Sequence, residues 1–520
     1  MKLVFLHTSD LHGYLWPTAY QKSDQEVPYS LSRLKTLIDE QYQTYGKDHV
    51  VLTDSGDFLQ GSAMAAYANQ IPYEAGLKPM CQAFNSLEYD AHVLGNHDFD
   101  FGLPYLKAFS KLTQPSVLLN SNILSTNLQE PFIGTPFKII VKSGIRIGLI
   151  GACTPFVDHW EPEANIKGLK FISITSAIKK MAAHVRPLVD VLVLIAHTGF
   201  ENDPETGQSL EPNNGENEGY RLLKEIPELD VFLVGHQHKK IALVLNHKAI
   251  VMPGVRGSCI GKVVLDVKRR ADGKIEIIDA ESILLSSQFY QPNHKMLQQL
   301  APLEAKTEKW LDQPLVHLKQ PILINDPVQA RLQGTPFINL VQQMQLFFTH
   351  ADLSETSLMS ETAPGFSQNV TRRQLFLNYP FANQLCCVQI TGSELKDILE
   401  YTASFLILKN GKVIFDPKRV TPYNQLYNFD LFYPLTYRVQ VSRPIGLRVT
   451  KLQLHHEPIL PDQKYKLAVN SYRASGGGFY PHFSAERIQK KLDSDYVQLF
   501  TTYFQKQPLL DTKIRYRFEP

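Results

Sequence analysis

The chain has 520 residues, more than one hydrophobic core ordinarily supports, so at least two domains are predicted. Its apolar fraction of 43% and charged fraction of 20% are ordinary for a soluble globular protein. The formal net charge of +2 excludes a general attraction for polyanions, so any anion binding must come from a local site.

The first residues, MKLVFLHTSDLHG, lack the features of an export signal. Their apolar run ends at Leu6, whereas a signal peptide has roughly 7–15 apolar residues and a small-residue cleavage site. No other stretch approaches the roughly 18 apolar residues that span a bilayer, so no membrane association is expected. The five cysteines are scattered and odd in number, which is typical of reduced, buried thiols. These features predict a cytoplasmic protein.

In the first half, short runs rich in Val, Ile and Leu alternate with helical patterns. A strand is predicted over 2–8, an amphipathic helix over 29–46 that ends at Gly46, and a second helix over 79–87. Further strands are predicted over 49–57, 92–96, 116–122, 137–152, 190–199 and 230–236. Because nearly continuous apolar strands are buried on both faces, the predicted class is α/β with helices on both sides of the sheets.

The sequence pattern changes after about residue 285. Residues 287–314 are polar and favour a helix, so we interpret them as a connecting helix. Beyond them, helices such as 337–348 and 392–406 alternate with short strands, and a glycine-rich loop follows at 475–479. The predicted organisation is a domain over 1–286, a connecting helix or hinge over 287–314, and a second domain over 315–520.

Five short motifs in the first half place polar side chains at the carboxyl end of an apolar strand. Ligands bind at that edge of an open α/β sheet, and the glycines in most of the motifs suit tight turns. The motifs are SDLHG, DSGDFLQGS, LGNHDFDFG, LIAHTG and VGHQH, and their candidate metal ligands are Asp10, His12, Asp57, Asn96, His197, His236 and His238.

The mixture of ligand types indicates a pair of divalent ions. Carboxylate, imidazole and amide oxygen favour Mn, Zn, Co or Fe, and the lack of cysteine argues against a structural zinc site. Seven ligands serve two ions only if one is shared, and Asp57 is the natural bridge because a carboxylate has two oxygens. Two ions roughly 3.5–4 Å apart can clamp a phosphoryl group for in-line attack. A lone D-x-H or H-x-H is more often a surface pair, but five motifs in this order make coincidence a poor explanation.

Together these motifs resemble those of the calcineurin-like metallophosphoesterases, and specifically their 5′-nucleotidase branch. The resemblance covers essentially the whole chain and implies a four-layer α/β/β/α metal domain followed by an α/β substrate domain. It implies one ion held by Asp10, His12, Asp57 and His238, and another held by Asp57, Asn96, His197 and His236. It also implies that Asn96 contacts the substrate, that His97 is catalytic with Asp100 orienting it, and that Asp98 supports the site.

The second domain is similar to the nucleotide-recognition domain of the same branch. YPFANQL (379–385) resembles the stretch that positions one aromatic of a base clamp, here Phe381 with Asn383 nearby. VNSYRASGGGF (469–479) resembles the loop with the second aromatic, and its candidate residues are Tyr472, Arg473, Gly476, Gly477 and Gly478. The alternatives are that the two aromatics belong to the core and that Arg473 is a solvated surface residue.

Details of the motifs lean toward the 2′,3′-cyclic-nucleotide 2′-phosphodiesterase/3′-nucleotidase group. SGDFLQGS, HTGFE and NSYRASGGG look like that group's sequences, and Gly478 replaces a loop aspartate of 5′-nucleotidases. Asp100 instead favours the 5′-nucleotidases, because the cyclic-nucleotide group often has asparagine at this position.

The resemblance therefore implies an enzyme that releases nucleoside and phosphate from a small-molecule nucleotide. A 5′-nucleotidase or a nucleotide-sugar or dinucleotide pyrophosphohydrolase is the alternative, and a non-catalytic nucleotide sensor is a distant one. No basic stripe accompanies the metal motifs, so no nucleic-acid polymer is expected as a partner. The sequence makes no prediction of oligomeric state.

Overall fold

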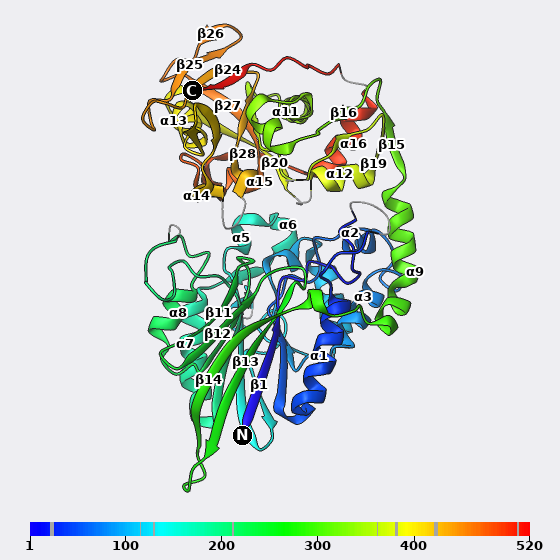
Figure 1. The fold of residues 1–520 in the computed structure, drawn as a ribbon, viewed down its shortest axis with the longest axis vertical. Helices are drawn as coiled ribbons and strands as arrows, with labels where there is room; N and C mark the ends of the chain where they lie inside the picture. The colour runs from blue at the N-terminus through cyan, green and yellow to red at the C-terminus, as the bar shows by residue number, and fades with distance from the viewer. Residues whose placement is uncertain are drawn as a thin grey trace. The chain divides into compact units, whose positions relative to one another are not determined.

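The computed structural model describes residues 1–20, 25–114, 116–127, 130–210, 213–360, 362–379, 383–420, 425–506 and 509–520. The chain divides into two compact units, Met1–Lys309 and Trp310–Pro520 (Figure 1). Helix α9 (His294–Leu311) crosses the division and lies within the segment predicted to connect the domains. The hinge role of that segment stays a prediction. None of the described helices has the length and apolarity that crossing a bilayer requires.

Two six-stranded sheets form the centre of the first unit. The first contains, in order of neighbours, β14 (Ile275–Ser286), β13 (Cys259–Arg269), β1 (Lys2–Thr8), β2 (Val50–Asp54), β3 (Ala91–His92) and β4 (Val117–Leu118). The second contains β11 (Lys240–Leu245), β12 (Lys248–Pro253), β10 (Val231–Val234), β9 (Val191–His197), β7 (Ile145–Cys153) and β6 (Phe137–Lys142). Strands β5 (Ile123–Ser125) and β8 (Leu169–Phe171) form a separate pair.

The inner faces of the two sheets share one hydrophobic core, which contains Phe5 and Val51 from the first sheet and Val193 and Leu233 from the second. Helices cover the outer faces, so the unit has the four layers that were predicted (Figure 1). They are α1 (Leu31–Tyr45), α3 (Leu77–Asn85) and α4 (Gly102–Leu112) on the first sheet, and α7 (Ile174–Val185) and α8 (Gly219–Glu225) on the second. The shorter helices are α2 (Ala63–Asn69), α5 (Val157–Trp160) and α6 (Glu163–Ile166).

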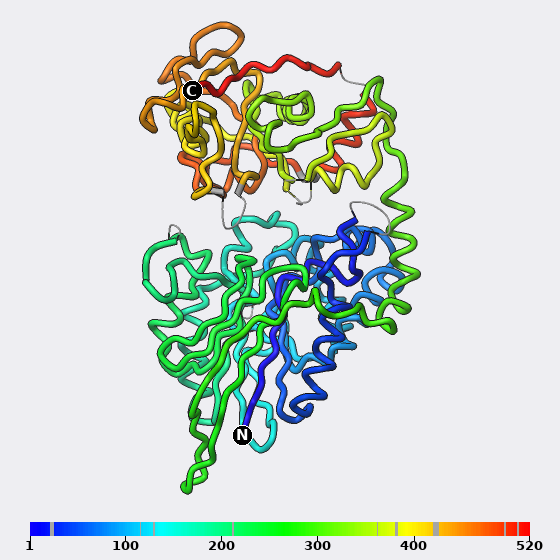
Figure 2. The backbone as a smooth tube through the Cα atoms, in the orientation of Figure 1, coloured from blue at the N-terminus to red at the C-terminus, as the bar shows by residue number. Residues whose placement is uncertain are grey.

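Strand β1 shows how the sequence specifies this arrangement. Every residue after Lys2 is buried in it, as expected of a strand covered on both faces. It pairs in parallel with β2 and antiparallel with the distant β13, so the first strand lies beside one formed some 260 residues later (Figure 2). The parallel strands β1 and β2, and β9 and β10, therefore end at the same edge of their sheets.

The predicted helix over 29–46 is confirmed as α1. It begins after Ser30, whose hydroxyl accepts a hydrogen bond from the Arg33 amide at 3.2 Å. It ends before Gly46, which has a φ of +82° that few other residues adopt easily.

The second unit contains a five-stranded and a four-stranded sheet. The five-stranded sheet has the order β23 (Leu431–Tyr433), β17 (Leu353–Thr356), β27 (Lys464–Asn470), β20 (Gln384–Thr391) and β28 (Ile488–Asp495). The four-stranded sheet has the order β26 (Glu457–Pro458), β25 (Val449–Leu454), β24 (Thr436–Gln440) and β29 (Tyr516–Glu519). Three further pairs are β15 (Pro314–His317) with β19 (Asn369–Thr371), β16 (Ile322–Leu323) with β18 (Gly365–Phe366), and β21 (Leu406–Lys409) with β22 (Lys412–Phe415).

Helices pack on these sheets around a single core. They are α10 (Pro327–Gln333), α11 (Pro336–Thr349), α12 (Arg372–Asn378), α13 (Gly392–Ala403), α14 (Pro417–Val420), α15 (Ser471–Ala474) and α16 (Tyr496–Gln505). Helices α11 and α13 confirm those predicted over 337–348 and 392–406. The start of α13 is fixed by a capping box, in which Thr391 and Glu394 each accept a hydrogen bond from the other's amide.

Candidate metal centre

The seven predicted ligands lie at or just beyond the carboxyl ends of β1, β2, β3, β9 and β10 in the first unit, and His197 is the last residue of β9. Five of them have a left-handed backbone, with φ between 49° and 76°: Asp10, His12, Asp57, His236 and His238. A non-glycine residue in that conformation costs roughly 1–3 kcal/mol and persists where its surroundings hold it, as at functional sites. The backbone is therefore bent at three of the five motifs, where the side chains of these five residues project from the strand ends.

Two glycines give these side chains room. A Cβ atom on Gly95 would lie 2.2 Å from Asp57 Oδ1, and one on Gly235 would lie 1.9 Å from Ser9 Oγ. Both distances are far below van der Waals contact, so only glycine allows the neighbouring chains to approach so closely.

The first group of ligand atoms belongs to Asp10, His12, Asp57 and His238, and all four lie within 4.8 Å of one another. His12 Nε2 is 3.1 Å from His238 Nε2 and 3.7 Å from Asp57 Oδ2. His12 Nδ1 lies 2.8 Å from the Gln60 carbonyl oxygen, which can only accept a hydrogen bond. The proton of His12 is therefore on Nδ1, and Nε2 presents its lone pair to the cluster.

A second group meets at the side-chain oxygen of Asn96. Its Oδ1 atom lies 2.9 Å from His197 Nε2 and 3.0 Å from His236 Nδ1. His197 Nε2 is also 3.3 Å from Asp57 Oδ2, and its Nδ1 is 2.7 Å from the Ser55 carbonyl oxygen. Asp57 thus lies between the imidazoles of both groups.

The charges of the cluster favour a cation. Burial raises the pKa of Asp10, but His238 and His197 outweigh it and lower that pKa to about 2. Burial also raises the pKa of Asp57, but His197 and His97 outweigh it and hold that pKa well below the usual value. Burial lowers the pKa of His12 to about 3, so its imidazole is neutral. Two buried carboxylates and a neutral imidazole suit a divalent ion.

His97 and Asp100 form a pair at the edge of the cluster. His97 Nδ1 lies 3.2 Å from Asp100 Oδ2, and the imidazole is 40% exposed whereas Asp100 is 9% exposed. The His97 amide donates to Asp57 Oδ1 at 2.8 Å, which ties the pair to the ligand set. Burial lowers the pKa of His97, but the carboxylates of Asp100 and Asp57 outweigh it and raise the pKa.

The predicted recognition residues lie in the second unit. Phe381 is outside the described residues. Asn383 immediately precedes β20, and Tyr472 lies on α15. The Gln384 amide donates to Ser471 Oγ at 3.1 Å, so these two positions adjoin at the same end of paired strands. Tyr472 is half-buried.

The glycine loop packs directly on the Tyr472 ring. A Cβ atom on Gly477 would lie 2.5 Å from that ring, so the loop backbone is in contact with its face. Gly476 and Gly478 have φ of +98° and +71°, which glycine adopts without strain. The three predicted glycines thus form a tight loop over the aromatic side chain.

Arg473 is buried, so it is not the solvated surface residue that one of the two interpretations of the sequence described. Its side chain is 1% exposed and bonds both oxygens of Asp430, at 2.6 and 3.0 Å. It also donates to the Gly477 carbonyl oxygen and lies 4.0 Å from the centroid of the Tyr480 ring. Arg473 therefore supports the glycine loop from beneath.

Comparison with known proteins agrees with this geometry. Residues 3–240 match the calcineurin-like phosphoesterase family, and residues 315–485 match the 5′-nucleotidase C-terminal domain. The chain belongs to the calcineurin-like phosphoesterases with a 5′-nucleotidase C-terminal domain. It is a metal-dependent hydrolase of phosphoric esters.

Three relatives illustrate the similarity. A 2′,3′-cyclic-nucleotide 2′-phosphodiesterase/3′-nucleotidase of Salmonella typhimurium is 27% identical, over 92% of this chain and 82% of that protein. The trifunctional nucleotide phosphoesterase YfkN of Bacillus subtilis is 24% identical over 98% of this chain, which spans only 38% of YfkN. The crystal structure of a putative 5′-nucleotidase from Staphylococcus aureus, in complex with alpha-ketoglutarate, has a TM-score of 0.88 and 29% identity, with complete coverage of both chains.

The structure adds residues of the phosphoesterase that the motifs did not single out. Glu216 Oε1 lies 3.1 Å from His236 Nε2 and so fixes the imidazole whose other nitrogen faces Asn96. The Asn165 amide bonds the Asp100 carbonyl oxygen and Glu161 Oε2, each at 3.0 Å. Burial and the nearby Asp100 carboxylate raise the pKa of Glu161 to about 9. Glu216, Asn165 and Glu161 lie outside the ligand motifs, so no local sequence pattern predicted their roles.

The structure also defines the surroundings of Asp98 and Phe479. The Asp98 carboxylate accepts hydrogen bonds of 2.8–3.0 Å from the amides of Gly95, Asp57, Phe58 and Leu59. Asp98 thus braces the turns that carry Asn96 and Asp57. On the recognition loop, Phe479 follows the glycines with a φ of +60° and is 47% exposed.

Proposed function

We propose that this phosphoesterase binds two divalent ions through the seven residues of the cluster. Asp10, His12, Asp57 and His238 would hold one ion, and Asp57, Asn96, His197 and His236 the other. The observation that supports this most strongly is the position of Asp57 Oδ2, 3.7 Å from His12 Nε2 and 3.3 Å from His197 Nε2. The donor set suits Mn, Zn, Co or Fe.

The residues present fit such a pair. The Nδ1 protons of His12 and His197 point to backbone carbonyls, so both Nε2 lone pairs face the cluster. When bound, two divalent ions polarise the phosphoryl oxygens and lower the pKa of a bound water.

Three side chains in and around the cluster contribute to the reaction beside the ions. The amide of Asn96 adds a donor near a phosphoryl oxygen, while its carbonyl oxygen stays in the ligand set. His97 is exposed and held by Asp100, so it can pass a proton to the departing ribose oxygen. Asp98 keeps the turns of Asp57 and Asn96 rigid through four amide hydrogen bonds, which keeps the reacting groups aligned.

For the substrate, we propose 2′,3′-cyclic nucleotides, whose ring opens first, followed by cleavage of the 3′-monoester to nucleoside and phosphate. Relatives named for this activity in Salmonella typhimurium and Yersinia enterocolitica are 27% and 26% identical over more than nine-tenths of this chain. Tyr472, under the glycine loop, supports the proposal because an aromatic face can stack a base.

A 5′-nucleotidase is the second candidate. The His97–Asp100 pair is of the type that 5′-nucleotidases use, and the Staphylococcus aureus structure with a TM-score of 0.88 is described as a putative 5′-nucleotidase. A nucleotide-sugar or dinucleotide pyrophosphohydrolase would share the metal chemistry.

A phosphate-release panel separates these candidates. The full chain would be loaded with Mn and assayed on 2′,3′-cAMP, 3′-AMP, 5′-AMP and UDP-glucose. We expect the highest kcat/KM on 2′,3′-cAMP and 3′-AMP. Preference for 5′-AMP would replace the proposed substrate with the second candidate, and inactivity on all four would contradict the enzyme proposal.

We also propose a cytoplasmic location. The five cysteines are unpaired and buried, as expected where thiols stay reduced. Fractionation of the source cells, followed by detection with an antibody, tests this, and recovery from an exported fraction would contradict it.

A further inference from the structure

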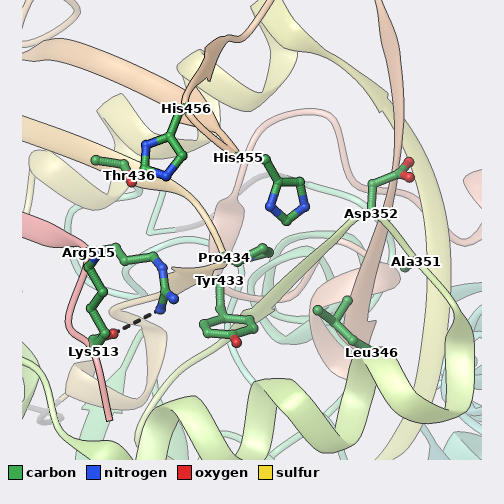
Figure 3. A pocket seen from close by; sticks show the side chains of 10 residues that line it. All are labelled: Leu346, Ala351, Asp352, Tyr433, Pro434, Thr436, His455, His456, Lys513 and Arg515. Carbon is green, nitrogen blue, oxygen red and sulfur yellow. Dashed lines mark hydrogen bonds between the residues drawn. The ribbon is translucent and has the colours of Figure 1, made fainter. Parts of the chain in front are cut away.

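A groove of about 540 Å³ lies in the second unit, beside the four-stranded sheet. Figure 3 shows its lining divided between two sides. Lys513, Arg515, His456 and Thr436 gather on one side, whereas Leu346, Ala351 and Asp352 lie on the other. Tyr433, Pro434 and His455 lie between them. All of these residues belong to Trp310–Pro520, so no residue of the metal cluster lines the groove.

The cationic side continues across the sheet as a row of like charges. Arg438 on β24 is directly opposite Lys451 on β25 and Arg517 on β29. A second hollow, of about 280 Å³, contains these three residues and shares Lys513 and Arg515 with the groove. Like charges directly opposite one another destabilise a sheet. The row therefore lowers the stability of this sheet, and a role in folding does not account for it.

Carboxylates neutralise only part of this charge. Arg515 pairs with Asp511 at 2.6 Å, and Arg438 lies 4.0 Å from Glu519. Among the described residues, no carboxylate lies within ion-pair distance of Lys451, Lys513 or Arg517. Asp352, the acidic residue of the lining, accepts the Lys466 amide at 2.8 Å. Three exposed cations thus remain available to an anion.

The turn between β25 and β26 adds the imidazole of His456 to the cationic side and that of His455 to the space between the two sides. It is a two-residue hairpin loop formed by His455 and His456, because Leu454 pairs with Glu457 across it. Both histidines have positive φ, 50° and 75°. Asn-Gly is the favoured sequence for such a turn, so two histidines are a poor local choice that presents two exposed imidazoles to the groove.

The other side of the groove suits an apolar or aromatic group. Leu346 and Ala351 are partly buried there, and Tyr433 presents a half-buried ring between the two sides. Arg515 lies 5.3 Å from the centroid of that ring, and the Tyr433 hydroxyl donates to Asp511 at 2.9 Å, so the ring and the guanidinium are both fixed. The volume lies in the range of small-ligand sites, roughly 300–1,000 Å³.

We propose that this groove binds a nucleoside polyphosphate, separately from the substrate of the metal cluster. The base lies against Tyr433, Leu346 and Ala351. The phosphates lie along Lys513, Arg517 and Lys451, where several adjacent cations match several adjacent negative charges. This assignment does not depend on the proposed function, since no residue of the metal cluster takes part.

Hydrogen–deuterium exchange of the full chain, with its metals bound, tests the location. The probe is the β,γ-imido analogue of ATP, with AMP as the comparison. We expect protection of 449–458 and 513–519 by the ATP analogue and weaker protection by AMP. Protection confined to Met1–Lys309 would overturn the proposal.

Calorimetric titration with the same analogue and with inorganic tripolyphosphate tests the chemistry. The triple variant Lys451→Ser, Lys513→Ser, Arg517→Ser should bind both about tenfold more weakly or worse, because it removes three charge-assisted hydrogen bonds to the phosphates. The matched control is Lys409→Ser, Lys412→Ser, Lys464→Ser, which removes three exposed cations from elsewhere in the same unit.

The control should keep the wild-type affinity. Equal weakening in both triple variants would mean unspecific charge attraction and would overturn the proposal. Tighter binding of a short single-stranded RNA than of the ATP analogue, lost in the first triple variant, would assign the surface to nucleic acid instead. If the triple variant fails to fold, the exchange experiment on the wild-type chain decides alone.

Discussion

The metal cluster of the first unit and the glycine loop of the second place their functional groups in opposite ways. In the cluster, Asp10, His12 and Asp57 project from bent, left-handed backbone, and the surrounding carbonyls orient the imidazoles. In the loop, Gly476–Gly478 are the part that packs on Tyr472, and the charged Arg473 is buried beneath them. In the first case the functional residues themselves adopt the unfavourable backbone conformation, whereas in the second a buried ion pair supports the loop.

The supporting charges of the second unit form a network with an unusual protonation. Arg473 pairs with Asp430, and the Glu355 carboxyl is fully buried next to Asp430. Neither Glu355 oxygen meets a hydrogen-bond donor among the described residues, so the two carboxyls face each other. Two facing carboxyls can share a hydrogen bond only if one is protonated. Burial and Asp430 raise the pKa of Glu355 well above its usual value.

The largest expected effect comes from the shared carboxylate of the first unit. Asp57→Asn should lower kcat by at least the roughly 10²–10³-fold that losing one electrostatic stabiliser costs, because both ligand groups meet at Asp57. Asp48→Asn, at an exposed position of the same unit, is the matched control and should keep full activity. Wild-type turnover by the Asp57 variant would separate the cluster from catalysis.

His97 should show an effect that depends on the leaving group. His97→Ala should lose about 10²-fold in kcat on 3′-AMP, the lower end of what general acid catalysis contributes, because the ribose oxygen needs a proton as it departs. The loss should be much smaller on a p-nitrophenyl phosphoester, whose leaving group is stable as an anion. Equal losses on both substrates would contradict a role in protonating the leaving group.

Substitution of Tyr472 tests base recognition by the second unit, and its expected effect on activity is smaller. Tyr472→Ala should raise KM by an amount equivalent to roughly 1–3 kcal/mol of lost base stacking, with little change in kcat. Tyr472→Phe keeps the aromatic face and should behave like the wild type. A KM unaffected by the alanine substitution would exclude Tyr472 from base recognition.

The smallest expected effect concerns pH and Glu355. Because the pKa of Glu355 is raised in the folded state, the folded chain keeps a proton that the unfolded chain releases. The free energy of unfolding therefore falls as pH rises above the unfolded pKa of about 4.3. Glu355→Gln removes this loss, so its melting temperature should exceed that of the wild type by a few °C at pH 8 and by less at pH 5. Glu457→Gln, which is exposed in the same unit, should show no such trend.

The fold of the first unit and the convergence of the ligand set could be predicted from the sequence because their causes are local. Continuous apolar runs predicted the buried strands, and Gly46 marked the end of α1. Each ligand motif follows its strand immediately, so the parallel ends of β1 and β2, and of β9 and β10, bring the motifs together.

The environment of Arg473 could not be predicted, because its partners are distant in sequence. Asp430 and Asn428 lie 43 and 45 residues away, and no motif links them to the glycine loop. Glu216 likewise reaches His236 from a loop that has no recognisable pattern. Side chains that act through long-range contacts leave no periodic or spaced signal.

Metal stoichiometry tests the central claim most directly. The full chain, purified without chelator and dialysed against metal-free buffer, would be analysed by inductively coupled plasma mass spectrometry alongside Asp57→Asn. We predict two divalent ions per wild-type chain and loss of both in the variant, because Asp57 joins the two ligand groups. A fully active wild-type chain that holds one ion or none would contradict the two-metal account.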